Sequence, residues 1–220
     1  MTTQPPKNSI SPEYLQLLMK FAERNIHRER LNGIYWQMLR RYVPLESIAK
    51  VDNAVIVSLA CGKADDAEVQ AQYVLENLLS TEDGKARFIG VDLPDSELPL
   101  ANRANRNDYN GRVAYEFMPG DARDLGTIIR EDADVFFISH SEPVSLKEVW
   151  KGIIAAMKPK HTKGGLLVAT FHNEDEMEAL RSMIGKDYAI LAATRNEYAI
   201  PDPHLDNIYS HKFLLAARRL

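Results

Sequence analysis

The stretch that decides the fold is VIVSLACGKADDAE, Val55–Glu68. It begins with a short apolar run, passes through a turn of small residues around Gly62, and ends in a polar segment suited to the start of a helix. Glycine lets the backbone approach a ligand closely because it carries no Cβ atom. The stretch therefore predicts the first strand, a ligand-binding turn and the first helix of an α/β domain.

Apolar strand-type runs and helical stretches alternate along the rest of the chain. We expect strands at Ala54–Leu59, Arg87–Val91, Arg112–Met118, Val135–Ser139 and Gly165–Phe171, and helices at Asp66–Leu79, Pro99–Tyr109, Asp124–Arg130, Ser145–Met157 and Glu174–Ile184. The last two strand-type segments, Ala189–Asn196 and Asn207–Arg218, have no room between them for a crossover helix, so they must run antiparallel. The sequence predicts an α/β three-layer sandwich, a mostly parallel seven-stranded sheet with an antiparallel C-terminal hairpin strand.

The N-terminal region predicts helices that precede the first strand. Ser11-Pro12-Glu13 is a helix-start signal, Asn32-Gly33 is expected to break the pattern, and residues 34–42 are expected to form a second short helix. We therefore divide the chain into an N-terminal helical extension or lid at residues 1–45 and a Rossmann-like domain at residues 46–220. The basic residues of the extension favour a solvated helix face over a lid that grips an acidic ligand.

Composition narrows the class of protein. The 220 residues are 45% hydrophobic and carry a formal net charge of −4, which does not favour a general nucleic-acid binder. Cys61 is the single cysteine, so no disulfide framework or thiolate metal cluster is expected. No apolar run approaches the length of a membrane span. We expect a cytoplasmic protein with neither a nucleic acid nor a membrane as partner, and leave a homodimer open.

Acidic residues follow the second and third predicted strands. Asp92 ends the second, where a carboxylate can accept hydrogen bonds from the two ribose hydroxyls of a nucleoside ligand. Its alternative role is to cap a turn before Pro94. Asp121 follows the third strand within Gly120-Asp121-Ala122, and its alternative role is to cap the next helix.

These features together resemble the class I S-adenosylmethionine-dependent methyltransferases over roughly residues 54–218. The resemblance rests on the glycine turn, Asp92, the Gly120-Asp121-Ala122 segment, the Lys158-Pro159 pair before the fifth strand, and the closing hairpin. It implies S-adenosyl-L-methionine as cofactor, with Asp121 accepting from the adenine amino group. The cofactor-binding residues that it implies are Ala60, Gly62, Asp92, Leu93, Asp121, Ala122 and Ser139. The family pattern has Gly-x-Gly-x-Gly in the turn, whereas this chain has alanine at positions 60 and 64, and Ser58 where an acid is usual.

The loops after the fourth and fifth strands would face the methyl acceptor. We expect His140 and His172 as catalytic residues, because histidine titrates near neutral pH, and Glu142, Tyr198 and His204 as substrate-binding residues. The alternatives remain a solvated polar loop around His140 and a plain hairpin loop around Tyr198 and His204. Only two histidines lie on these adjacent loops, so no metal ion is expected.

The sequence therefore predicts methyl transfer to oxygen or nitrogen of a small-molecule acceptor. One alternative is an inactive methyltransferase-like binding or scaffold protein, suggested by Ser58 and the two alanines. Another is a nucleotide-dependent oxidoreductase, which the closing hairpin and the thirty-residue interval from Gly62 to Asp92 disfavour.

Overall fold

The computed structural model of this chain describes residues 28–44, 48–103, 106–200 and 211–220. Residues 28–42 form a helix that precedes the first strand. The strands that follow are β1 (Asn53–Leu59), β2 (Lys85–Asp92), β3 (Val113–Pro119), β4 (Ala133–Ile138), β5 (His161–Phe171), β6 (Tyr188–Arg195) and β7 (Phe213–Arg219). The helices are α2 (Ala67–Asn77), α3 (Leu98–Arg103), α4 (Leu125–Ile128), α5 (Lys147–Met157) and α6 (Glu174–Ile184), with 3₁₀ turns η2 (Ala122–Asp124), η3 (Lys158–Lys160) and η4 (Gly185–Asp187).

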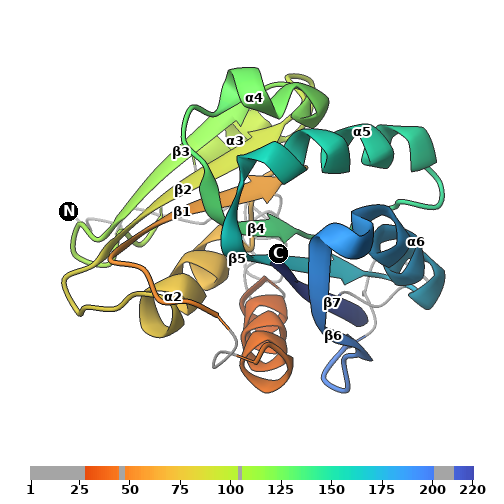
Figure 1. Cartoon of the computed structure of the whole chain (residues 1–220). Helices are drawn as coiled ribbons and strands as arrows, with labels where there is room; N and C mark the ends of the chain where they lie inside the picture. Colours follow the sequence, from red (N-terminus) through yellow and green to blue (C-terminus); the bar gives the residue numbers. More distant parts are fainter. Residues whose placement is uncertain (1–27, 45–47, 104–105, 201–210) are drawn as a thin grey trace, which may run out of the picture.

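The seven strands form one sheet in the order β3-β2-β1-β4-β5-β7-β6 (Figure 1). The neighbouring pairs among β1 to β5 are parallel, whereas β7 runs antiparallel to both β5 and β6. Six strands therefore point one way and β7 alone is reversed, which confirms the predicted sheet and its C-terminal hairpin strand. The chain leaves β1 toward β2 on one side and returns to β4 on the other, so a ligand crevice is expected at the carboxyl ends of β1 and β4.

Helices cover both faces of the sheet, as predicted for a three-layer sandwich (Figure 1). Alternate side chains of β1 point to opposite faces, so Ile56 joins one core and Val57 the other. The first core includes buried residues of the 28–42 helix and α2, and the second includes residues of α5 and α6. Among the described residues, none of the helices combines the length and apolar character needed to cross a membrane.

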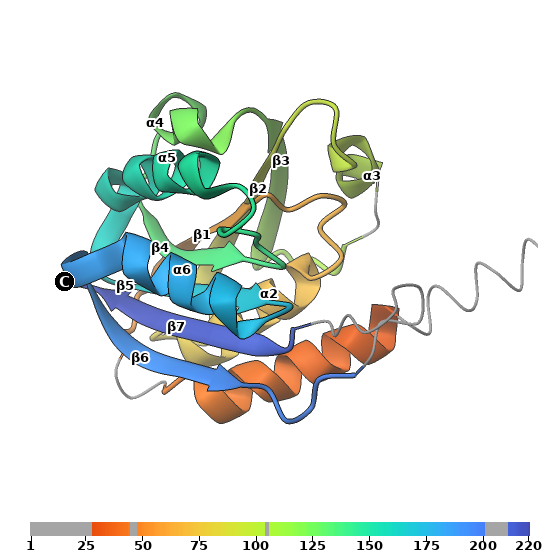
Figure 2. The ribbon, with the colours of Figure 1, turned by 90° about the vertical axis from the view of Figure 1, so that its right-hand side faces the viewer.

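The helix over residues 28–42 runs without interruption through Asn32 and Gly33, so the predicted break there is wrong. Tyr35, Met38 and Leu39 on one face are completely buried against the domain. This burial outweighs the cost of about 1 kcal/mol that a glycine adds inside a helix. Figure 2 shows the helix lying alongside β6 and β7. The preceding predicted helix from Ser11 lies outside the described residues.

Three further elements differ from the predicted bounds. Helix α3 stops within the predicted 99–109 helix, because Asn107 and Asp108 accept hydrogen bonds from backbone N–H groups two residues ahead and turn the chain. Strand β5 begins four residues earlier than predicted, at His161. Strand β7 begins only at Phe213, after His211 and Lys212, although the prediction began the strand at residue 207.

Candidate functional site

A cavity of about 350 Å³ lies at the carboxyl ends of β1 and β4, where the topology predicts a ligand crevice. We call it the central cavity. Its walls come from the 28–42 helix, the turn after β1, the start of α2, the loop after β4, and His211, which lies two residues before β7. The lining residues are Leu31, Ser58, Ala60, Cys61, Gly62, Lys63, Ala64, Asp65, Asp66, Ala67, Gln70, Glu97, Ser139, His140 and His211.

The turn after β1 follows a left-handed backbone path at three alternating positions. Ala60, Gly62 and Ala64 have φ values of 52°, 53° and 55°. Only glycine adopts this region without steric cost, because a Cβ atom crowds the neighbouring carbonyl oxygen. The turn therefore has the backbone that a Gly-x-Gly-x-Gly sequence would favour, with alanine at two of its three left-handed positions.

The first testable consequence concerns Ala60, which is exposed. Replacing Ala60 by glycine is expected to raise the free energy of unfolding by about 0.5–1 kcal/mol, because it removes the left-handed strain of the alanine. Urea unfolding followed by circular dichroism measures this change. Ala60→Val is the control and is expected to destabilise the protein. A loss of stability in Ala60→Gly would contradict the left-handed turn.

Asp92 ties together the loops that follow β1, β2 and β3. The Gly62 N–H donates to Asp92 Oδ2 at 2.5 Å, and the Leu93 N–H donates to Asp92 Oδ1 at 2.7 Å. The Gly120 N–H donates to the Asp92 carbonyl oxygen at 2.8 Å. The carboxylate is therefore fixed against the glycine turn, and each of its oxygens retains a lone pair for a further donor.

Asp121 has the capping role that was the alternative in the sequence. Its carboxylate accepts the Arg123 N–H at 2.9 Å and caps η2. The Arg123 guanidinium also donates to both carboxylate oxygens, at 2.5–3.0 Å. These hydrogen bonds from Arg123 hold the pKa of the Asp121 carboxyl below its usual value. Each carboxylate oxygen of Asp121 already accepts two N–H groups of Arg123, so a contact with adenine requires Arg123 to move.

Cys61 sits in the same turn with its thiol close to Gly90 of β2. Burial raises the pKa of this thiol to about 12, and the nearby Asp92 carboxylate adds to the increase. A thiol with so high a pKa stays protonated at neutral pH and is a poor nucleophile. Cys61 therefore acts as a small packing residue.

A cluster of Asp66, His140 and His211 forms one wall of the central cavity. One potential ligand atom from each of the three side chains lies within 4.8 Å of the other two, and His211 Nε2 is 3.9 Å from Asp66 Oδ1. Asp66 immediately precedes α2, His140 follows β4, and His211 precedes β7. Because β7 is reversed, its first residues lie at the edge of the sheet where the parallel strands end.

Thr170, at the end of β5, holds two members of this cluster. The His140 N–H donates to Thr170 Oγ1 at 3.3 Å, and His211 Nδ1 lies 3.1 Å from the same oxygen. His140 has a φ of 56°, an uncommon conformation for a residue other than glycine. Strained backbone of this kind is concentrated at functional sites.

Aromatic rings extend the cluster on both sides. The ring of Tyr35 stacks on His211 at a centroid separation of 4.4 Å and an interplanar angle of 1°. The His140 ring lies 4.3 Å from that of His211 and 4.7 Å from that of His172. Burial, followed by the charge of His172, lowers the pKa of His211 to about 3. The His211 imidazole is therefore neutral at physiological pH.

Asp66 and Gln70 supply the polar groups on the α2 side. Burial raises the pKa of the Asp66 carboxyl, whereas His140 and a hydrogen bond from Ser139 lower it. The Gln70 amide nitrogen lies within 3.5 Å of the oxygens of Tyr35 and Ser139. Gln70 is 1% exposed, and its Oε1 has no hydrogen-bond partner among the described residues. The cavity wall thus offers a buried acceptor with unused capacity.

The structure brings only some of the predicted site residues into one place. Ala60, Gly62, Ser139 and His140 line the central cavity. Of the other residues expected to bind the cofactor, Leu93 is 53% exposed and Ala122 is buried at the start of η2.

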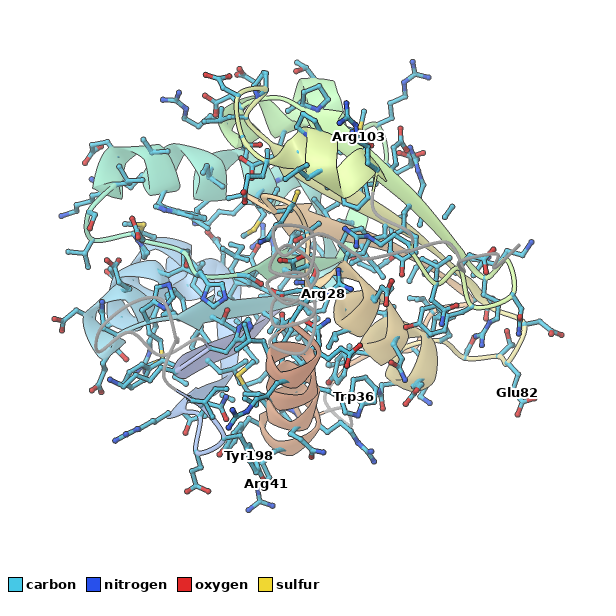
Figure 3. The ribbon with its side chains drawn as sticks, turned by 180° about the vertical axis from the view of Figure 1, so that it is seen from behind. Arg28, Trp36, Arg41, Glu82, Arg103 and Tyr198 are labelled. Atoms are coloured by element: carbon cyan, nitrogen blue, oxygen red, sulfur yellow. The ribbon has the colours of Figure 1, made fainter. Side chains whose placement is uncertain are left out.

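The residues predicted to face the acceptor separate into two groups. His172 and Glu142 line a neighbouring cavity of about 320 Å³, and only His172 reaches the cluster, through its ring stack with His140. Tyr198 is 43% exposed and lines neither cavity; Figure 3 shows it toward the end of the 28–42 helix that carries Arg41. His204 lies outside the described residues. The arginines at positions 28, 30, 40 and 41 are exposed, as expected of a solvated helix face.

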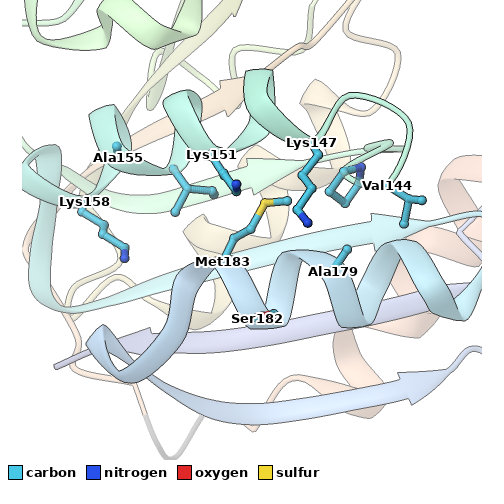
Figure 4. Close-up of a pocket in the computed structure, with 10 residues that line it drawn as sticks. Val144, Lys147, Lys151, Ala155, Lys158, Ala179, Ser182 and Met183 are labelled. Carbon is cyan, nitrogen blue, oxygen red and sulfur yellow. The ribbon is translucent and has the colours of Figure 1, made fainter.

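A larger cavity, of about 660 Å³, lies between α5 and α6 (Figure 4). Lys147, Lys151 and Lys158 line it together with apolar residues such as Met183. Lys151 pairs with Glu148 and Lys158 pairs with Asp187. None of the predicted site residues lies there, so size alone does not identify the functional site.

No protein-family model matches this chain, and no curated protein matches it. Solved structures do. The chain is similar to an S-adenosylmethionine-dependent methyltransferase from Clostridium acetobutylicum, with 10% identity, a TM-score of 0.56, and coverage of 94% of this chain and 98% of that one. It is also similar to magnesium protoporphyrin IX methyltransferase from Synechocystis with bound S-adenosylmethionine, with 14% identity, a TM-score of 0.53, and coverage of 88% and 80%.

The chain has the class I methyltransferase fold. This agrees with the strand order and with the single reversed strand, and it confirms the fold implied by the resemblance. A third similar structure is an rRNA methylase from Streptococcus thermophilus, with 14% identity, a TM-score of 0.52, and coverage of 89% of this chain and 95% of that one.

The rRNA methylase overturns the prediction that nucleic acid is excluded as a partner. That prediction rested on the net charge of −4. Net charge is a sum over the whole chain, whereas contact with phosphate depends on the local field of a few basic side chains.

Sequence reasoning missed Asp66, His211, Gln70 and Thr170. The sequence pattern places Asp66 at the polar start of a helix and His211 inside a predicted strand. The usable signal was a histidine directly before an apolar run in a reversed strand, because such a residue returns to the edge where parallel strands end.

Proposed function

We propose that this protein is an S-adenosylmethionine-dependent methyltransferase. The observation that supports it most directly is the fixing of the Asp92 carboxylate against the left-handed glycine turn by the Gly62 N–H. A turn of small residues and a carboxylate at the end of the next strand are what an adenosine-containing ligand requires at the switch point of a doubly wound sheet. The similarity of fold to methyltransferases supports the same reading.

The residues present fit this cofactor. Asp92 keeps one lone pair on each oxygen for the ribose hydroxyls, because each oxygen accepts one backbone N–H. Ala60 and Ala64 add only methyl groups to a backbone that already follows the glycine-favoured path. When bound, S-adenosylmethionine supplies a methyl group activated by a sulfonium centre. The contribution of this chain is then to hold donor and acceptor in line and to exclude water.

The acceptor enters the same region in this proposal. His140 lines the central cavity, and the His172 ring stacks on the His140 ring. These two imidazoles are therefore the groups placed to receive a proton from an acceptor. We propose a small molecule as acceptor, because the neighbouring cavity of about 320 Å³, which His172 and Glu142 line, has the volume that a small ligand occupies beside the cofactor. We further propose that residues 1–45 form an extension of the domain at 46–220, and Leu31 of the 28–42 helix, which lines the central cavity, supports this division.

Calorimetry with the purified full-length chain tests the cofactor. We expect saturable binding of S-adenosylmethionine and S-adenosylhomocysteine at one site per chain, and no binding of NADH. Radiolabelled methyl transfer to a panel of small hydroxy and amino compounds, rRNA and tRNA then identifies the acceptor class. Absence of binding by both adenosyl compounds would refute the proposal, and labelling of RNA alone would replace the small-molecule acceptor.

A binding module without catalysis is the second candidate, and the Asp121–Arg123 ion pair favours it. All the acceptor positions of Asp121 are used internally, which weakens the expected adenine contact. Weak binding of S-adenosylhomocysteine without turnover on any acceptor would support this second function.

A further inference from the structure

We infer that Asp66, His140 and His211 bind a divalent first-row transition-metal ion in the central cavity. The three side chains come from distant parts of the sequence, and one potential ligand atom of each lies within 4.8 Å of the other two. Two imidazoles and one carboxylate form a ligand set that suits zinc, iron or nickel ions and leaves coordination positions open. This departs from the expectation that no metal is bound.

The ligand atoms of Asp66, His140 and His211 lie slightly farther apart than they would around a bound ion. Metal–ligand bonds of about 2.0–2.1 Å bring ligand atoms to about 3–3.5 Å from one another. His211 Nε2 and Asp66 Oδ1 are already at 3.9 Å. Small side-chain rotations therefore complete the site without a change of fold.

Thr170 supplies the orienting contact that a metal-binding histidine normally has. A ligand histidine usually directs its second ring nitrogen at a hydrogen-bond partner, which fixes the tautomer. His211 Nδ1 lies 3.1 Å from Thr170 Oγ1, so donation of the Nδ1 proton leaves the Nε2 lone pair facing Asp66. Tyr35, stacked at 1° on the same ring, restrains its rotation. Thr170 is thus a positioning residue for the site.

The cavity also offers an acceptor for a molecule bound to the ion. Gln70 lines the same wall and its buried Oε1 has no hydrogen-bond partner among the described residues. A metal-bound water or hydroxyl group is a strong donor, because the cation draws electron density from its oxygen. A buried oxygen without a partner is costly, and such a donor would satisfy it.

The ion has a consequence for the acceptor, and this consequence rests on the proposed function. The glycine turn and the cluster line one cavity, so an acceptor hydroxyl on the ion would face the methyl donor. With the ion bound, His140 serves as a ligand and not as a proton acceptor. The hydroxyl then loses its proton to solvent, its oxygen forms the bond to the methyl carbon, and the carbon–sulfur bond breaks with its electron pair passing to sulfur. The acceptor class is then a hydroxyl compound that can coordinate a metal.

Metal binding by the full-length, tag-free, EDTA-treated chain tests the inference. We expect one Zn²⁺ per chain by calorimetry, a Co²⁺ d–d absorption spectrum that Zn²⁺ displaces, and no comparable binding of Mg²⁺, which prefers oxygen ligands. Asp66→Asn keeps the side-chain shape and is expected to weaken Zn²⁺ binding by about 100-fold or more. Thr170→Val is expected to weaken it by about 10-fold.

Glu76→Gln is the matched control, because Glu76 is an exposed carboxylate on α2, the helix that Asp66 precedes, and it does not line the central cavity. It is expected to bind Zn²⁺ as the unchanged chain does. Thermal unfolding verifies that each variant is folded, and His140→Gln serves as a second ligand variant. Equal Zn²⁺ affinity in Asp66→Asn, His140→Gln and the unchanged chain, or no Zn²⁺ binding at all, would overturn the inference.

Separate titrations keep the two proposals distinguishable. Zn²⁺ binding without S-adenosylmethionine binding supports the metal site and refutes the methyltransferase. S-adenosylmethionine binding without Zn²⁺ binding refutes the metal site and leaves the methyltransferase supported.

Discussion

Replacing Asp92 by alanine is expected to weaken the binding of S-adenosylhomocysteine by about 100-fold or more. The change removes the proposed ribose acceptor and leaves the Gly62 N–H without the carboxylate that fixes the turn. Hydrogen bonds to a charged group contribute about 1.5–3 kcal/mol each, so two of them account for a loss of this size. Calorimetry, with displacement titration for the weakened variant, measures it.

Asp121→Ala is the control for this prediction. The resemblance assigns both aspartates to the cofactor, but the Asp121 carboxylate is fully engaged by Arg123 whereas Asp92 keeps free lone pairs. We therefore expect Asp121→Ala to weaken binding by no more than about 5-fold. Asp92→Asn, which retains one acceptor oxygen, should lie between the two. Equal losses for the two alanine variants would show that Arg123 releases Asp121 when the ligand binds.

Gly90→Ala is expected to destabilise the protein by about 2–3 kcal/mol. A Cβ atom at position 90 would lie 2.5 Å from Phe117 Cδ1 and 2.9 Å from Cys61 Sγ. Gly90 is buried in β2 between β1 and β3, so neither neighbour can move away freely. Overpacking of this kind costs about 1–3 kcal/mol, and a loss of 2–3 kcal/mol lowers the Tm by several degrees in a chain of this size.

Gly33→Ala provides the control for this second prediction. Gly33 lies inside the 28–42 helix with no atom within 4 Å of an added Cβ. Alanine there is expected to stabilise the protein by about 0.5–1 kcal/mol, because it favours the helix. Differential scanning calorimetry of both variants measures the two changes in stability. A Gly90→Ala variant as stable as the unchanged chain would mean that Phe117 and Cys61 have room that their distances do not indicate.

Much of the sheet could be predicted because its signals are local. The apolar run of β1, the helix pattern of α6 and the absence of a helix between the last two strands are properties of short segments. The predicted helix at 174–184 coincides with α6 because Asn173 caps it through the Glu176 N–H. The break at Asn32-Gly33 was wrong because the burial of Tyr35 and Met38 is a tertiary effect that outweighs local propensity.

Part of the candidate site could likewise be predicted from the sequence, and part could not. Gly62 and Asp92 follow predicted strands directly, so their meeting at one edge of a parallel sheet could be inferred from the sequence. The pairing of Asp121 with Arg123 could not be distinguished from a free carboxylate, because both are compatible with a cap. The roles of His211 and Thr170 depend on where β7 inserts beside β5, which local pattern does not determine.

The sequence by itself determined an alternating α/β chain, its reversed last strand and the turn around Gly62, because each depends on residues near one another along the chain. Only the tertiary structure decided that Val55–Glu68 ends in a cluster shared with two distant histidines. Asp66 from this stretch meets His140 and His211 because the sheet order places β1, β4 and the start of β7 around one cavity. Contacts between residues so far apart in the sequence depend on how the whole sheet packs. They therefore cannot be predicted from the pattern of any short segment.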